Sequence, residues 1–219
     1  NHPIYRHQLA EGHRFPMEKY DLLPQQLIYE GTCAEENFFE PEIPNNKHFF
    51  TVHDPEYFFD LLNITLSQKA VRRIGFPLSE VLVEREMIIA DGTMKASEFA
   101  LQNGIAMNIA GGTHHAFSNR GEAFCMLNDQ AIAAKYLQQK GLANKILIVD
   151  LDVHQGNGTA EIFQNDASVF TFSMHGKSNY PFVKEKSDLD IALENDTKDT
   201  AYLSILKETL PKLIHQEKP

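Results

Sequence analysis

An almost unbroken apolar run at residues 145–150 is the feature that most restricts how this chain can fold. Its letters, KILIVD, place four apolar side chains in succession. A strand that is apolar on both faces is typical of a parallel sheet covered by helices. A clear helix pattern precedes the run at 128–137, and short helix and strand patterns follow at 159–163 and 168–172. This alternation predicts an α/β fold with a central, mainly parallel sheet.

Weaker patterns predict the remaining elements. Strands are expected at 26–30, 48–52 and 105–109. Helices are expected at 56–62, 65–73, 97–102 and 200–215. The helix at 56–62 has the best start signal, because Asp54 can cap it and Pro55 suits its first turn. No repeat or boundary interrupts the pattern, so we expect one domain over residues 1–219.

Composition excludes several classes of protein. The 219 residues carry 20 Lys and Arg against 30 Asp and Glu, a net charge of −10. Such a chain lacks the basic surface that binds nucleic-acid phosphates, and no apolar run approaches the roughly 18 residues of a membrane-spanning helix. Its two cysteines, Cys33 and Cys125, are too few for a disulfide-stapled secreted fold. We therefore expect a cytoplasmic protein that binds neither nucleic acid nor membrane, while its oligomeric state stays open.

The apolar run ends in a segment rich in metal-binding side chains, Asp150-Leu-Asp-Val-His-Gln-Gly-Asn-Gly158. Alternation along an extended chain places Asp150, Asp152 and His154 on one face. Two carboxylates and an imidazole on one edge need a compensating cation, and this donor set suits zinc or ferrous iron. A solvated acidic loop, with His154 capping the next helix, is equally consistent with this sequence. This segment alone leaves both interpretations open.

A second polar segment follows the expected strand at 105–109. Its letters, Ala110-Gly-Gly-Thr-His-His-Ala116, put His114 and His115 directly after two glycines and a threonine. In α/β folds, ligands bind where parallel strands end. Two histidines can hold one acid and one base together if their partners shift their pKa values apart. An exposed loop without a role is the alternative, but two such segments at two strand ends favour a hydrolytic metal site.

Other catalytic chemistries find little support. The sequence has no Walker-type phosphate loop or dinucleotide-binding fingerprint, and no Gly-x-Ser-x-Gly elbow. Cys125 lies shortly after the histidines, but its neighbours Phe124, Met126 and Leu127 favour a buried thiol over a nucleophile.

Four segments together resemble the zinc-dependent histone deacetylase family, and in particular its bacterial and class IV members related to acetoin-utilisation proteins. They are GGTHHA at 111–116, AFCMLND at 123–129, VDLDVHQGNG at 149–158 and FSMH at 172–175. The resemblance runs through most of the chain. It implies a three-layer arginase/deacetylase-like fold and a metal-dependent amide hydrolase that removes acetyl groups from acetyl-lysine or related acylated amines.

The resemblance also implies a role for each matching residue. Asp152 and His154 would be two of three protein ligands to the catalytic zinc, with ferrous iron as the alternative ion. A structural potassium ion would be bound by Asp150, Asp152, the His154 carbonyl and Ser173. The tandem histidines would handle the protons of the attacking water and the leaving amine, each oriented by a partner: His114 by Asp150, and His115 by Asn157. The tunnel for the acyl-lysine stem would be lined by Phe124 and Tyr180, for which ordinary core packing is the alternative.

Two parts of the family's site have no counterpart here. The family's third zinc ligand is an aspartate in a Gly-Asp-Pro segment, and a tyrosine after glycines stabilises the oxyanion. After His175 there is no Gly-Asp-Pro, and the tyrosines there, Tyr180 and Tyr202, do not follow glycine. We therefore expect a domain that lacks its C-terminal part and a first strand, with poor metal affinity and weak or no activity.

Two other functions stay open. Arginase-like chemistry on two manganese ions would need more bridging aspartates than Gln155 and Asn157 provide, and the identity and number of bound metals would distinguish it. A module that binds acylated amines without cleaving them would bind acetyl-lysine peptide and release no acetate. No residue chooses between acetyl-lysine peptides and small acylated amines as the partner, although an acidic surface attracts cationic substrates.

Overall fold

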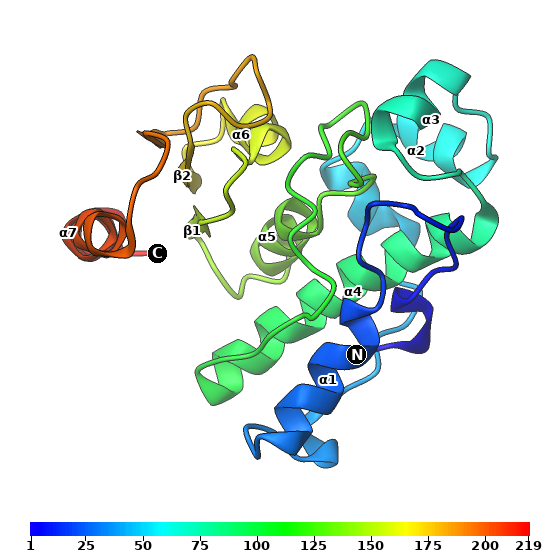
Figure 1. Cartoon of the computed structure of the whole chain (residues 1–219), viewed down its shortest axis with the longest axis horizontal. Helices are drawn as coiled ribbons and strands as arrows, with labels where there is room; N and C mark the ends of the chain where they lie inside the picture. Colours follow the sequence, from blue (N-terminus) through cyan, green and yellow to red (C-terminus); the bar gives the residue numbers. More distant parts are fainter.

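Helices and 3₁₀ turns are the regular elements of the first two thirds of the chain in the computed structural model, which describes all 219 residues (Figure 1). The α-helices there are α1 Lys19–Tyr29, α2 Pro55–Leu62, α3 Gln68–Ile74, α4 Glu80–Asn103 and α5 Asp129–Gln139. Three short 3₁₀ turns accompany them, η1 Pro3–Tyr5, η2 Glu35–Asn37 and η3 Asn46–Thr51. Four of the helices begin where a polar side chain accepts a first-turn N–H, as such caps favour: Asp54, Ser67, Ser79 and Asn128.

A three-stranded parallel sheet follows the helices. Its strands are β1 (Ile146–Asp150), β2 (Val169–Gly176) and β3 (Leu189–Leu193), paired in the order β1-β2-β3. The register pairs Asp150 of β1 with Ser173 of β2. The polar residues that follow β1 therefore lie at the carboxyl edge of the sheet, as the sequence predicts.

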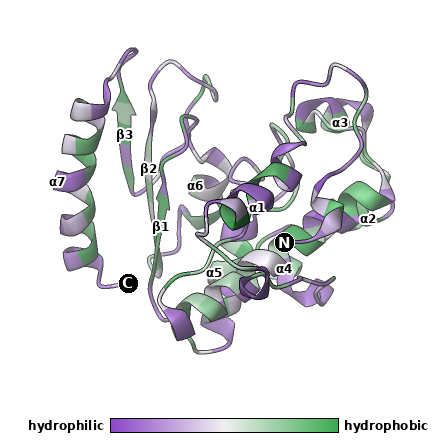
Figure 2. Ribbon diagram, turned by 60° about the horizontal axis from the view of Figure 1, so that its bottom comes forward, coloured by the Kyte–Doolittle hydropathy of each residue, from purple (hydrophilic) through white to green (hydrophobic).

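Helices cover both faces of this sheet. α6 (Asn157–Phe163) connects β1 to β2, and α7 (Asp199–Glu217) follows β3. α7 lies along one face, whereas α5 and α6 lie on the other side (Figures 1 and 2). Under α7, Leu213 packs with Phe172 and Met174 of β2 in a small buried cluster. The predicted layered α/β fold is confirmed.

The main core lies between the helices. A cluster of 27 buried residues is organised around α4 and α5. Phe49 and Phe58 stack within it, with ring centroids 4.8 Å apart, and both side chains are fully buried. This core supports the segment 110–129, which runs from α4 back to α5.

Three predicted strands are wrong. Residues 26–30 lie in the last turn of α1 and just beyond it, and the aromatic run 48–52 forms the end of η3, where Asn45 caps the turn and Phe49 points into the core. Residues 105–109 pair with no strand, and Ile105 and Met107 are 78% and 70% exposed. Strand propensity measures packing against sheet neighbours, and these segments have none.

Other elements lie outside the predicted patterns. β3, most of α1 and residues 80–96 of α4 are regular structure that the sequence patterns do not indicate. The proline Pro24 inside α1 and the buried polar residues of α4 obscure helical periodicity. None of the helices combines the length and the apolar character that crossing a membrane requires.

Candidate active site

The acidic segment after β1 forms turns in which aspartate side chains accept hydrogen bonds from backbone N–H groups two residues further along the chain. Asp150, the last residue of β1, is buried and accepts a hydrogen bond from the Asp152 backbone N–H at 3.0 Å. Asp152 in turn accepts the His154 backbone N–H at 2.7 Å. Leu151 and Val153 point the other way and line a hollow of about 580 Å³ at the strand ends. The alternation predicted for this segment is therefore realised in a turn rather than in a strand.

The histidine-bearing segment is fixed by the residues that start α5. The buried carboxylate of Asp129 accepts the backbone N–H groups of Gly112, at 3.1 Å, and Thr113, at 2.8 Å. The neighbouring Asn128 donates through its side-chain amide to the Ala116 carbonyl at 3.1 Å. Both ends of the His114-His115 pair are thus held by one helix start.

The two polar segments approach each other through their backbones. A Cβ added to Gly158 would lie 2.2 Å from the Ala116 carbonyl oxygen and 2.8 Å from that of His114. The Thr159 N–H donates to the same His114 carbonyl at 3.2 Å. Only glycine fits at residue 158, because any side chain would push the histidine-bearing segment away.

Each tandem histidine has its own partner from the β1 side. The Nδ1 of His114 donates to the Asp150 carboxylate at 2.5 Å, and the Nδ1 of His115 donates to the Asn157 side-chain oxygen at 2.6 Å. The two imidazole rings lie 4.1 Å apart. In both rings the Nε2 atom stays available for a ligand. The structure therefore brings together all four residues predicted as the catalytic group.

The different partners separate the charge states of the two rings. Burial alone would lower the pKa of His114, but the hydrogen bond and charge of Asp150 outweigh it and the pKa is raised. Burial, and then the charge of His114, lowers the pKa of His115 to about 4. The pKa values of the two neighbouring rings are thus shifted in opposite directions, as in sites that divide acid and base roles between two groups.

Asp152 and His154, the predicted metal ligands, lie beside the tandem histidines. The Asp152 Oδ1 is 3.0 Å from the His154 Nδ1 and 4.0 Å from the His114 Nε2. Burial would raise the pKa of Asp152, but the His154 backbone N–H and the neighbouring imidazoles hold it below its usual value. An ionised oxygen donor beside a nitrogen donor, with side chains 51% and 43% exposed, fits zinc or ferrous iron in part. No group of three His, Cys, Asp or Glu side chains in the chain is arranged to hold a metal ion.

The predicted tunnel residues lie in different surroundings. Tyr180 packs edge-on against His115, with centroids 5.1 Å apart, and lies 6.3 Å from the His154 ring. Its hydroxyl donates to Glu122 Oε2 at 2.7 Å. Burial and this hydrogen bond raise the pKa of the Tyr180 hydroxyl. Tyr180 thus forms one wall of the candidate site.

Phe124 belongs to another aromatic cluster. Its ring contacts Phe76 and Phe15, at centroid distances of 4.9 and 5.2 Å. Its backbone, with that of Ala123, adopts the left-handed conformation, at φ 69° and 44°. Hydrogen bonds from both N–H groups to the carbonyls of Arg73 and Ile74 hold this unusual turn.

Two further predicted residues are placed by the strands. Ser173 is buried beside Asp150 in the register, and its hydroxyl lies 3.0 Å from His175 Nδ1. Cys125 is buried, which confirms the prediction of a buried thiol, and burial raises the pKa of this thiol.

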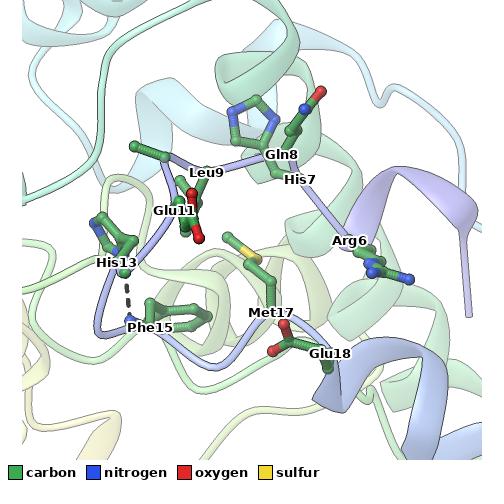
Figure 3. Close-up of a pocket in the computed structure, with 11 residues that line it drawn as sticks. Arg6, His7, Gln8, Leu9, Glu11, His13, Phe15, Met17 and Glu18 are labelled. Atoms are coloured by element: carbon green, nitrogen blue, oxygen red, sulfur yellow. Dashed lines mark hydrogen bonds between the residues drawn. The ribbon is translucent and has the colours of Figure 1, made fainter.

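A hollow of about 560 Å³ lies apart from these residues, along the N-terminal segment 6–18 (Figure 3). His13 and Phe15 line it; His13 accepts the Phe15 N–H at 3.1 Å, and both rings also contact Phe124. None of the predicted site residues lines this hollow. It therefore borders the Phe124 cluster rather than the histidine pair.

Three residues that sequence reasoning did not assign to the site support it. Asp129 anchors the histidine-bearing segment, Glu122 holds Tyr180, and Gln155 bonds to Glu185. The signal for Asp129 is its place in the AFCMLND segment, directly at a helix start. No signal identifies Glu122, because its partner lies 58 residues away.

Comparison with known proteins identifies the family of the chain. The family model of the histone deacetylase domain matches residues 13–219. An uncharacterized protein of Picosynechococcus sp. is 48% identical over 218 residues, covering 100% of this chain and 73% of that protein. Histone deacetylase 2 of Arabidopsis thaliana is 28% identical over 213 residues, covering 90% of this chain and 54% of that protein. The chain belongs to the histone deacetylase family.

Solved structures show the same fold. An HDAC homolog from Aquifex aeolicus superposes with a TM-score of 0.83 at 22% identity, covering 100% of this chain and 65% of that one. The acetoin utilization protein AcuC of Staphylococcus aureus is 24% identical in sequence, over 99% of this chain and 61% of its own length. The chain thus spans between about half and three quarters of the length of these relatives.

Proposed function

We propose that residues 1–219 form a single deacetylase-like α/β domain that acts on acylated amines by amide hydrolysis. One observation carries the proposal. Two adjacent histidines, each oriented through Nδ1 by its own partner, face a paired carboxylate and imidazole that can bind zinc. Membership of the histone deacetylase family supports the reaction class. A solved HDAC homolog of the same fold is complexed with SAHA, which supports the binding of an acetyl-lysine-like ligand.

The residues of the chain divide the work. Asp152 and His154 would hold zinc, which when bound polarises the amide carbonyl and lowers the pKa of water. The tandem histidines accept the proton of the attacking water and deliver a proton to the leaving nitrogen. Water and the acyl amide thereby yield a carboxylate and an ammonium. The Tyr180 ring would flank the alkyl stem beside His115. Asp150, Asp152, the His154 carbonyl and Ser173 would hold a potassium ion, which when bound would offset the charge of the carboxylates.

The experiment measures acetate released from an acetyl-lysine peptide by the zinc-loaded protein. We expect His115→Ala to lower turnover by at least about a hundredfold, with zinc content close to that of the parent. His215→Ala, on the exposed side of α7, is the matched control and should change neither quantity. Unchanged turnover in His115→Ala would remove this residue from the mechanism.

A second function is favoured by the number of metal donors. Asp152 and His154 supply two donors, and no group of three His, Cys, Asp or Glu side chains is arranged to hold a metal ion, whereas a catalytic zinc site normally has three protein ligands. A module that binds acylated amines would bind the peptide and release no acetate in the same experiment. If the protein neither binds the peptide nor releases acetate, both functions are contradicted.

A further inference from the structure

The side chain of Gln155 joins the candidate metal ligands to a distant segment. It directly follows His154 and is fully buried. Its Nε2 donates to the Glu185 carbonyl and to Asp190 Oδ1, at 2.8 Å each. Its Oε1 accepts the Glu185 N–H at 2.9 Å. The amide therefore pairs with both backbone polar groups of Glu185, as a neighbouring strand would.

Glu185 belongs to the segment 177–188, which joins β2 to β3 and carries Tyr180. The middle of this segment has little apolar packing, since Phe182 and Val183 are 88% and 85% exposed. The Lys184 ammonium bonds only to carbonyls within the segment. At residues 180–186 the side-chain hydrogen bonds to other elements run from Tyr180 to Glu122 and from Gln155 to Glu185. At the end of the segment, Asp188 bonds to Thr171 of β2.

We propose that Gln155 is a positioning residue that holds Tyr180 against His115 and His154. By fixing Glu185, it restrains the segment five residues beyond Tyr180, while Glu122 restrains the Tyr180 hydroxyl. Because Gln155 is bonded to His154 along the chain, the same residue ties the wall of the site to its metal donors. The consequence for substrate rests on the proposed function, whereas the restraint on Tyr180 does not.

The test labels the protein with 3-fluorotyrosine and follows the fluorine resonance of Tyr180, assigned with Tyr180→Phe. The chain has seven tyrosines, so six serve as internal references. We expect Gln155→Ala to shift or broaden the Tyr180 resonance and leave the others in place. Tryptic cleavage after the exposed Lys186 should accelerate at least about tenfold. Gln164→Ala, at an exposed glutamine that ends α6, is the matched control.

A second variant tests the same bond from the exposed side. Glu185→Pro removes the N–H that Gln155 Oε1 accepts and leaves the buried amide intact. Glu185→Ala keeps that N–H and is its control. We expect Glu185→Pro to reproduce the change in the Tyr180 resonance and Glu185→Ala to leave it unchanged.

The proposal is overturned if the Tyr180 resonance and the cleavage rate match the parent in both Gln155→Ala and Glu185→Pro. Binding of acetyl-lysine peptide to the zinc-loaded protein separates this result from the proposed function. A parent protein that binds the peptide, with at least tenfold weaker binding in Gln155→Ala, supports both. A parent that binds no peptide contradicts the proposed function, and the fluorine result still decides the role of Gln155.

Discussion

Asp129 and Thr113 hold each other through both backbone and side chain. The Asp129 carboxylate accepts the Thr113 N–H at 2.8 Å, and the Asp129 N–H donates to the Thr113 hydroxyl at 3.0 Å. Both side chains are buried, and the bonded partners lie 16 residues apart. Thr113 directly precedes the tandem histidines. The hydrogen bonds to the start of α5 therefore fix the position of the backbone at His114.

Asp129→Asn tests this anchor. The amide keeps one acceptor oxygen but loses the charge and the second acceptor, which Gly112 also uses. We expect the free energy of unfolding to fall by about 2–4 kcal/mol and amide exchange at Gly112 and Thr113 to accelerate. Denaturant unfolding and hydrogen-exchange mass spectrometry measure the two effects. Asp199→Asn, at an exposed aspartate in α7, should change stability by no more than about 0.5 kcal/mol. Equal exchange in Asp129→Asn and the parent would contradict the anchor.

Zinc binding tests the pair Asp152 and His154. We expect Asp152→Ala and His154→Ala each to weaken zinc binding at least tenfold. Removing a residue that only hydrogen-bonds to a metal ligand typically weakens binding by about tenfold or more, and removing a ligand itself should cost no less. His114→Ala keeps both donor atoms and should bind within a few-fold of the parent. Calorimetric titration with zinc measures all three. Parent-like affinity in both Asp152→Ala and His154→Ala would place the metal elsewhere.

His53 makes stability depend on pH. It is fully buried, donates through Nδ1 to the Phe117 carbonyl at 3.0 Å and accepts the Asn128 N–H through Nε2, also at 3.0 Å. Burial lowers its pKa to about 4, from an ordinary value near 6.5. Between these values only the unfolded chain binds the proton, so stability falls as pH is lowered from about 6.5 to 4.

The expected contribution of His53 over that interval is about 3 kcal/mol. His53→Gln cannot titrate, and its unfolding free energy should lack this part of the slope. The difference between parent and variant isolates His53 from Glu86, whose pKa burial raises to about 7 and whose effect has the opposite sign. Denaturant unfolding at several pH values gives both curves, and parallel curves would show that His53 has the same pKa in the folded and unfolded chain.

Two neighbouring phenylalanines test the core around α2. Phe58 is fully buried and stacks on Phe49, whereas Phe59 is 49% exposed. We expect Phe58→Ala to lower the unfolding free energy by about 3–5 kcal/mol, because it leaves a cavity. Phe59→Ala, with the same change of side chain, should cost about 1 kcal/mol or less. Equal losses in thermal or denaturant unfolding would mean that the two rings are buried alike.

Much of the fold could be predicted because helix caps and apolar runs stabilise the elements in which they occur. Asp54 caps α2 and Asn128 caps α5 at the residues where the sequence indicates a helix start. The apolar run at 145–150 forms a strand because helices cover both faces of the sheet. The run at 48–52 has equally good strand composition, but the Asn45 cap and the burial of Phe49 favour a 3₁₀ turn.

The contacts of the candidate site also fall into those that a sequence pattern can indicate and those that it cannot. The partners Asp150 and Asn157 lie next to the metal-binding letters, so a family pattern contains them. The bonds from Tyr180 to Glu122 and from Gln155 to Glu185 join residues 58 and 30 positions apart. Their formation depends on how the segment 177–188 lies across the site, which no local pattern encodes.

The contact at Gly158 sets a limit on how this site can vary. Where two segments meet through side chains, substitution can widen or narrow the gap between them in small steps. Here backbone meets backbone, with the Ala116 carbonyl at the place a Cβ would occupy. The backbone geometry therefore sets the spacing between the tandem histidines and the segment that carries Asp152 and His154. Substitutions can change the side chains on the two segments, but they cannot adjust the distance between the segments at Gly158.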